Sequence, residues 1–306
     1  MIYFFYSLAI ISFIIIAFGF YAGHRLLHPK RVSTEEAMKI QTAKGEISSE
    51  FLKVQKHLFR IPSEFGYDLT GFYITGKIKK TIIFCHGISW NKYGNVKYLD
   101  RFLNEGWNIF LYDHRGAGES GIALPSFGFF EKLDLKTISD FALKKFPDPS
   151  LFGVFGESLG GSVAMQFTNI ASRLDFVVAV CPFQSLRELL EFHFARIKIP
   201  KMLCFPILFF TNLYVRLWGE FSIQDIQPGE DVLKNKIPLF LSHGKKDLVS
   251  PYASTERTYM VRKEIAPTVF FSSETDGHTP DLFSNNKEEF ERILNDFLLL
   301  AQKTKA

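Results

Sequence analysis

Three short stretches of the sequence carry side chains that could act together as a nucleophile, a base and an acid. Ser158 lies in the pentapeptide Gly-Glu-Ser-Leu-Gly at residues 156–160, Asp247 follows the run LFLSHGKK, and His278 ends the run SSETDGH. A serine hydroxyl is a poor nucleophile until a base takes its proton, and histidine is the side chain that most often does so. A carboxylate such as Asp247 would hold the imidazole in the required tautomer and stabilise the imidazolium. These residue types predict covalent catalysis through Ser158.

The residues around Ser158 predict a sharp turn from a strand into a helix. An apolar run, Leu151–Phe155, precedes it, and an amphipathic helical stretch, Ser158–Ala171, follows. Gly156 and Gly160 remove Cβ atoms where the backbones of such a turn crowd together. We therefore expect the Ser158 side chain to project above a sheet, at the N-terminus of a helix.

A second glycine turn predicts the groups that would stabilise a developing negative charge. His86 and Gly87 directly follow the apolar run Thr81–Cys85. Backbone amides at such a turn can form an oxyanion hole together with the amide that follows the nucleophile. We expect the amides of Ile88 and Leu159 in this role.

Other acids and histidines compete with these assignments. Asp276 and Asp281 are alternatives to Asp247, but Asp276 is only two residues from His278, which is too close to orient it from a separate loop. His243 precedes a glycine at a strand end, and we expect it to be structural.

A literal G-x-G-x-x-G occurs at Gly116, Gly118 and Gly121, after the apolar run Ile109–Tyr112. A dinucleotide-binding turn needs its third glycine to open a helix, whereas here the next helix is expected only near Phe130. The motif therefore predicts a loop, and no cofactor is expected.

Charge and histidine spacing argue against two further classes of function. The net charge of +4 comes from 36 Lys and Arg against 32 Asp and Glu. This excess is too small to indicate nucleic-acid binding. His86, His114 and His193 lack the spacing and acidic partners of metal ligands, so no metal site is expected.

Short apolar strands alternate with amphipathic helices along most of the chain. The expected strands are 55–61, 67–74, 81–85, 107–112, 151–155, 176–181, 238–242 and 268–272. The expected helices are 96–104, 130–145, 158–171, 253–263 and 287–301. This alternation predicts an α/β fold with a mostly parallel sheet covered by helices on both faces, and the first two strands fit an antiparallel edge.

The N-terminus and one long insertion depart from this alternation. Residues 2–23 carry no charged side chain, and at 1.5 Å per residue they reach about 33 Å, enough to cross a membrane. A basic leader and a small-residue cleavage site are absent, so we expect an anchor at 1–23 rather than a signal peptide. Residues 24–50 form a juxtamembrane segment and 51–306 the catalytic domain. Its phenylalanine-rich insertion, about 183–236, predicts a helical cap that either packs on the sheet or offers an acyl pocket or bilayer-facing surface.

The sequence resembles the α/β-hydrolase superfamily over roughly residues 50–300. It is most similar to bacterial membrane-anchored serine hydrolases related to the prolyl-oligopeptidase and serine-aminopeptidase-like branch. The matching stretches, in the order of the family, are HG, YDHRGAGES, FGFFEKLDL, GESLGG, HGKKDLVSP and GH.

The resemblance implies an eight-stranded sheet and a triad in the order Ser158, Asp247, His278. It also implies that Asp113 and Arg115 pin the glycine loop. The implied activity is hydrolysis of an ester or thioester, with a small acyl or lipid-like substrate as partner and no oligomeric state specified. A serine peptidase and a non-catalytic membrane adaptor on the same scaffold are the alternatives.

We predict that the catalytic domain faces the cytoplasm. No Lys or Arg precedes the apolar span, whereas Arg25, Lys30 and Arg31 follow it, and cationic loops stay inside. The cysteines at 85, 181 and 204 lie far apart in apolar runs without disulfide spacing, so we expect reduced core thiols, which fit a reducing compartment. Protease shaving of sealed cells should spare the domain, and its digestion from outside would contradict this topology.

Overall fold

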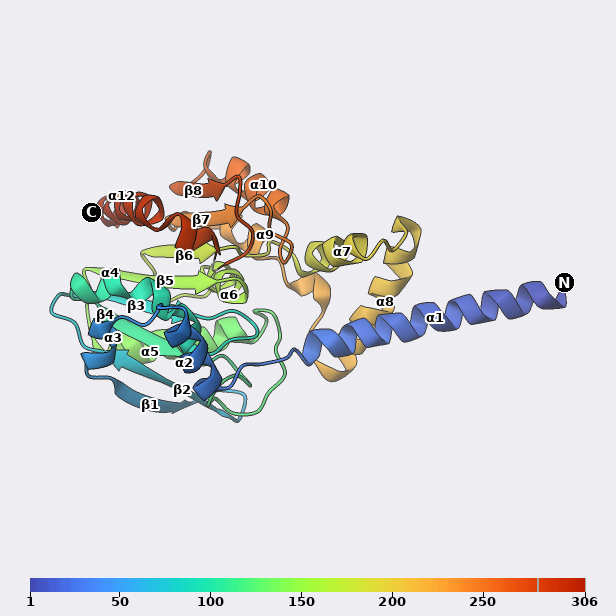
Figure 1. The fold of residues 1–306 in the computed structure, drawn as a ribbon, viewed down its shortest axis with the longest axis horizontal. Helices are drawn as coiled ribbons and strands as arrows, with labels where there is room; N and C mark the ends of the chain where they lie inside the picture. The colour runs from blue at the N-terminus through green and yellow to red at the C-terminus, as the bar shows by residue number, and fades with distance from the viewer. Residues whose placement is uncertain (280, 306) are drawn as a thin grey trace.

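A single sheet of eight strands forms the centre of the protein within the described residues, which are 1–279 and 281–305 of a computed structural model (Figure 1). The strands are β1 His57–Pro62, β2 Asp68–Ile74, β3 Lys80–Cys85, β4 Asn108–Tyr112, β5 Leu151–Glu157, β6 Phe176–Val180, β7 Leu239–Gly244 and β8 Thr268–Ser273. Their order is β1-β2-β4-β3-β5-β6-β7-β8. The pairs β1–β2 and β2–β4 are antiparallel and the remaining pairs are parallel, which confirms the predicted α/β fold with its antiparallel edge.

Helices cover both faces of the sheet because its central strands are apolar on both sides. The helices are α1 Ile2–Leu27, α2 Thr34–Ala43, α3 Ser49–Lys53, η1 Lys92–Tyr98, α4 Leu99–Asn104, α5 Glu131–Lys145, α6 Leu159–Phe167, α7 Leu186–Arg196, α8 Lys201–Trp218, η2 Ile223–Asp225, α9 Pro228–Leu233, α10 Tyr252–Arg262, α11 Asp281–Asn285 and α12 Lys287–Lys305. On β3, Ile83 packs in the core layer of α5 and α6, whereas Phe84 packs in the layer of α4 and α12. Continuous apolar strands of this kind are typical of a parallel sheet buried on both faces.

Three of the predicted helices differ from those observed, the last of them, expected at 287–301, only by continuing to Lys305. The helix expected at 96–104 begins as the 3₁₀ helix η1 and becomes α-helical only in α4. The Asn91 side chain caps η1. Two buried lysines of η1 form ion pairs, Lys92 with Asp113 and Lys97 with Glu157. The helix expected at 158–171 ends at Phe167, where the Thr168 amide donates to the carbonyl of Met165, three residues earlier, instead of continuing the α-helical pattern.

The glycine loop after β4 is a tight turn. Gly116 and Gly118 have φ of 62° and 52°, and the Gly116 amide donates to the carbonyl of Gly121. The buried Asp113 carboxylate accepts hydrogen bonds from Lys92 and from the amide of Glu119. A Cβ on Gly118 would lie 2.3 Å from that carboxylate, so glycine is needed there for the turn to form.

The insertion after β6 forms the predicted cap from α7, α8, η2 and α9. Along the side of α8, Phe210 and Tyr214 contact the C-terminal part of α1. Cys204 on α8 is partly exposed, so the prediction of a core thiol was wrong there, whereas Cys85 and Cys181 are buried.

Helix α1 projects from the domain, and residues 1–14 are exposed (Figure 1). Among the described residues it is the helix that is long and apolar enough to cross a membrane by itself. Helix α8 is long and apolar enough only when it is counted together with Ile223–Leu233, from which it is separated by an 88° bend. The helix continues four residues beyond the expected end at 23, since Leu27 is buried against the cap.

Candidate active site

Ser158 lies at a strained turn between β5 and α6. Its φ of 55° and ψ of −118° fall outside the regions that L-residues favour. A Cβ on Gly160 would lie 2.0 Å from the carbonyl oxygen of Cys85, and a Cβ on Gly156 would lie 2.1 Å from the carbonyl oxygen of Gly160. Only glycine at these two positions allows the backbones to approach so closely, and the turn leaves Ser158 at the start of α6.

Asp247 and His278 form a hydrogen-bonded pair. The His278 Nδ1 lies 2.6 Å from the Asp247 Oδ2, and the other carboxylate oxygen accepts the backbone amides of Val249 and Ser250. Burial alone would raise the pKa of Asp247, but hydrogen bonds from His243 and His278 outweigh burial and hold it well below its usual range. The carboxylate is therefore ionised beneath the imidazole.

The same contacts favour the protonated form of His278. Burial alone would lower the pKa of His278, whereas its hydrogen bonds with Asp247 and Cys181 raise it above the ordinary value. The Asp247 carboxylate therefore stabilises the imidazolium that would form when the His278 ring accepts a proton.

A buried network joins the Ser158 turn to the His278 loop. Glu157 precedes Ser158, and its carboxylate lies 2.6 Å from the amine of Lys97 and accepts the Tyr98 hydroxyl at 2.7 Å. Thr279, directly after His278, hydrogen-bonds to the same carboxylate. Burial alone would raise the pKa of Glu157, but Lys97, together with hydrogen bonds from Tyr98 and Thr279, outweighs burial and keeps the pKa below its ordinary value. The Glu157 carboxylate thus connects η1, the Ser158 turn and the His278 loop.

The predicted oxyanion loop lies against the nucleophile. A Cβ on Gly87 would lie 3.6 Å from the Cβ of Ser158. The amide of His114 donates to the Nε2 of His86 at 2.9 Å, so the Nδ1 of His86 carries its proton and donates to the carbonyl of Gly87 at 2.7 Å. Burial lowers the pKa of His86 to about 4, which keeps this ring neutral. The predicted role of His86 and Gly87 in shaping the turn thus has a specific hydrogen-bonding basis.

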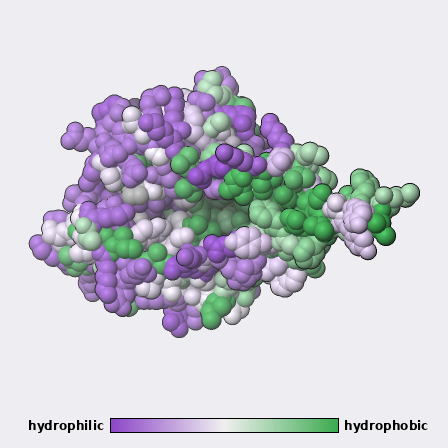
Figure 2. Space-filling view, turned by 45° about the vertical axis from the view of Figure 1, so that its right-hand side comes forward, coloured by the Kyte–Doolittle hydropathy of each residue, from purple (hydrophilic) through white to green (hydrophobic). Residues whose placement is uncertain are grey.

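Ser158 opens into a mainly apolar pocket of about 200 Å³, which also contains both predicted oxyanion residues, Ile88 and Leu159. The cap and the end of α1 supply much of the wall. The remaining lining residues are Arg25, Leu26, Pro29, Phe127, Phe183, Leu189, Leu190, His193, Val249 and Ser250. Figure 2 shows hydrophobic surface gathered where α1 and the cap meet, with a hollow beside it. The pocket can hold an apolar group next to the nucleophile.

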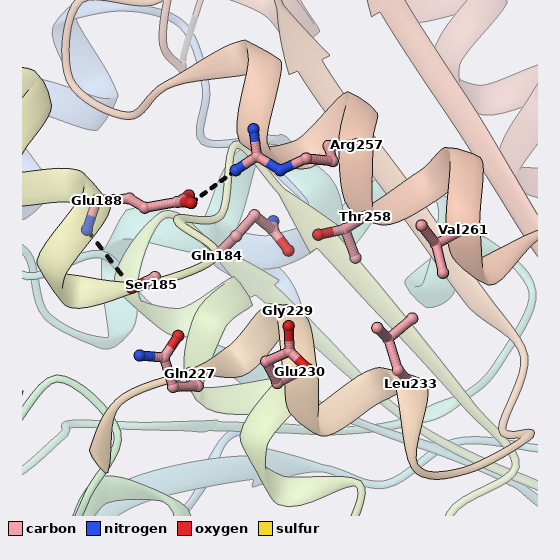
Figure 3. A pocket seen from close by; sticks show the side chains of 10 residues that line it. All are labelled: Gln184, Ser185, Glu188, Gln227, Gly229, Glu230, Leu233, Arg257, Thr258 and Val261. Atoms are coloured by element: carbon pink, nitrogen blue, oxygen red, sulfur yellow. Dashed lines mark hydrogen bonds and ion pairs between the residues drawn. The ribbon is translucent and has the colours of Figure 1, made fainter. Parts of the chain in front are cut away.

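A second hollow, of about 220 Å³, lies between α7, α9 and α10 (Figure 3). Its lining is more polar, and Arg257 there pairs with Glu188 at 2.7 Å. None of Ser158, Asp247 and His278 lines it, whereas Ser158 lines the apolar pocket.

Comparison with known proteins gives the family. The family model of the α/β hydrolase fold matches residues 80–198. The uncharacterized protein YqkD of Bacillus subtilis is 31% identical over 289 residues, which cover 93% of each chain. The chain belongs to the α/β-hydrolase family.

Two solved structures share this fold. The Pyrococcus furiosus esterase Pf2001 has a TM-score of 0.66 and 23% identity, over 82% of this chain and 92% of the esterase. The Pyrococcus horikoshii acylaminoacyl peptidase has a TM-score of 0.56 and 19% identity, over 76% of this chain and 39% of the peptidase. These likenesses show the shared fold.

One cluster in this α/β-hydrolase has groups that could ligate a metal. Ligand atoms of Cys181, Asp247 and His278 lie within 4.8 Å of one another. Metal ligation requires a thiolate, but burial raises the pKa of Cys181 and favours the protonated thiol. Two of the three groups, Asp247 and His278, are already hydrogen-bonded to each other. The arrangement therefore fits proton transfer better than metal binding.

Sequence reasoning missed two residues that support the site. His243, expected to be merely structural, lies with its Nε2 2.9 Å from the Asp247 carboxylate, and its position four residues before that aspartate was an available signal. Lys97 was not singled out, and nothing local marks it as the buried partner of Glu157. Glu157 is buried in this ion pair. Asp276, the rival acid, bonds to Asn285 and Asn286.

We predict that Lys97→Met lowers the free energy of unfolding by about 3–5 kcal/mol, because it leaves the Glu157 carboxylate buried without a countercharge. The Lys97→Met/Glu157→Gln double variant should recover part of the loss. Urea unfolding of the full-length protein in detergent measures both.

Lys136→Met is the matched control. Its amine lies at the same 2.6 Å from a carboxylate, that of Asp140, but both side chains are exposed. An exposed pair of this kind contributes about 0.3–0.5 kcal/mol. A Lys97→Met loss no larger than the control's would contradict the role of the buried pair.

Proposed function

We propose that this protein is a membrane-anchored serine hydrolase that cleaves carboxylic esters or thioesters through an acyl-enzyme. The observation that carries the proposal is Ser158 at a glycine-flanked turn, opening into an apolar pocket. The buried Asp247–His278 pair, connected to this turn through Thr279 and Glu157, supports it.

In the proposed mechanism the Ser158 Oγ attacks the carbonyl carbon of the substrate while His278 takes the hydroxyl proton. The amides of Ile88 and Leu159 stabilise the oxyanion, and loss of one such donor typically costs about 2.7–4 kcal/mol. The carbonyl re-forms, the bond to the alcohol or thiol breaks, and His278 protonates that leaving group. Water then attacks the acyl-enzyme with His278 again as base, which releases the carboxylic acid and Ser158.

The packing of α1 favours a retained anchor over a cleaved signal peptide. Leu27 is 1% exposed, and Gly19 and Gly23 lie tightly against α8. Removal of α1 would uncover this apolar surface of the cap and part of the pocket wall. We therefore propose a single, retained N-terminal membrane helix. The Lys and Arg residues that follow it favour the cytoplasmic side for the domain.

We predict that Ser158→Ala, His278→Ala and Asp247→Asn each lower kcat by about 10⁴-fold or more, because the three groups act as a unit. Asp276→Asn tests the rival acid. The measurement is kcat for p-nitrophenyl acetate, with thermal unfolding to verify folding. An active Asp247→Asn enzyme beside a folded, inactive Asp276→Asn enzyme would overturn the acid assignment.

We predict that kcat/KM rises from acetyl to medium-chain p-nitrophenyl esters. Each methylene buried in an apolar pocket contributes about 0.8 kcal/mol, or about fourfold in affinity. The full-length protein in detergent is the right sample, because the end of α1 lines the pocket. A flat or falling profile, with faster cleavage of aminoacyl amides, would favour the peptidase alternative. No turnover of any ester or amide would favour the adaptor.

A further inference from the structure

The last third of α1 and the cap helix α8 form one tightly packed helix pair. A Cβ on Gly19 would lie 2.6 Å from the Cβ of Phe210, and one on Gly23 would lie 2.7 Å from the Cβ of Tyr214. Two glycines four residues apart allow this close approach, as in associating membrane helices. The position of α1 therefore determines where α8 lies.

The length of α1 determines the depth of this contact. Residues 2–22 rise about 32 Å at 1.5 Å per residue, which barely exceeds the roughly 30 Å of a bilayer's hydrocarbon core. Nearly all of this segment is thus needed to cross. Phe18 contacts Phe194 and Phe20 contacts Phe210, so these parts of the cap lie at the depth of the nearer leaflet.

The outer face of α8 suits this depth. Phe205, Phe209 and Leu217 are 74%, 57% and 60% exposed, and they follow one another at helical spacing. The hydrophobic surface of Figure 2 is continuous from the cap to α1. An exposed apolar stripe of this kind, beside a membrane span, is suited to contact with the acyl chains of lipids.

Aromatic and cationic side chains mark the boundary with the headgroups. Tyr214 stacks on Trp218 with ring centroids 4.2 Å apart, and both lie towards the domain end of the pair. The exposed Arg25 and Arg216 lie in the last turns of α1 and α8. Tyr and Trp favour the interface and Arg the headgroups.

The pocket begins where this helix pair ends. Arg25, Leu26 and Pro29 line the same pocket as Ser158 and Leu190 of α7. An acyl chain that lies in the leaflet beside α8 would thus be close to the pocket along a wall of α1.

We propose that α8 is embedded with α1 in the nearer leaflet, and that the substrate is an acyl lipid ester of that leaflet. Its acyl chain reaches Ser158 past the end of α1 without passing through water. This deepens the proposed function and rests on it for the chemistry, whereas the depth of α8 is independent of activity.

Depth-dependent quenching tests the location of α8. In full-length Cys204→Ser protein, an environment-sensitive fluorophore is attached at Phe209→Cys or, as control, at Leu58→Cys. Leu58 is 80% exposed on the edge strand β1. The vesicles contain phosphatidylcholine, phosphatidylglycerol and a lipid with a nitroxide on its acyl chain. We expect strong quenching at 209 and little at 58, and equal quenching at both would overturn the embedded position.

Kinetics test the substrate. 1-Monooleoylglycerol in vesicles is compared with soluble p-nitrophenyl acetate, using the Phe205→Asp/Phe209→Asp variant and a Leu58→Asp control. We define the ratio as kcat/KM for the lipid ester divided by kcat/KM for the acetate. This ratio should fall at least about tenfold in Phe205→Asp/Phe209→Asp, because charge is costly in the leaflet, and should stay unchanged in Leu58→Asp. Gly23→Leu, which separates α1 from Tyr214, should lower the ratio likewise, whereas Ala17→Leu on the exposed side of α1 should not.

The outcomes separate the two proposals. Wild-type turnover of the acetate but not of the lipid ester, or an unchanged ratio in the variants, would overturn the lipid substrate alone. Turnover of neither ester would overturn the proposed function, and the quenching result would still decide where α8 lies.

Discussion

Backbone crowding at Gly160 is the constraint on which the site depends. The start of α6 passes so close to the end of β3 that a Cβ there would lie 2.0 Å from a carbonyl oxygen. This approach forces Ser158 into its strained conformation and brings the loop after β3, with Gly87 and Ile88, beside it. The nucleophile lies at the junction of β5 and α6, and the loop with Ile88 begins at the end of β3, so close backbone packing at both places limits reorganisation during reaction.

Buried polar groups then attach the remaining loops to this turn. Glu157 holds Lys97 and Thr279, and Asp247 holds His243 and His278. Each carboxylate lies in a low-dielectric interior where an unpaired charge is costly, so displacing either loop would leave a charge without partners. Stability and alignment of the site therefore depend on the same contacts.

The glycine turns and the apolar strands could be predicted because their signals are local. A turn that excludes Cβ atoms requires glycine, and buried parallel strands require continuous apolar runs. The Lys97–Glu157 pair could not be predicted, since an isolated sequence marks neither charge as buried. The packing of α1 on the cap was also missed, because a helix that is apolar on all sides does not indicate which face meets a partner.

Covalent labelling tests the central claim, that Ser158 is an activated nucleophile, most directly. The full-length protein is treated with a fluorophosphonate, and the modified peptide is identified by mass spectrometry. The account predicts one adduct, on Ser158, which is absent in Ser158→Ala and forms much more slowly in Asp247→Asn. An adduct on Ser120 of the glycine loop, or none on the folded wild-type protein, would contradict it.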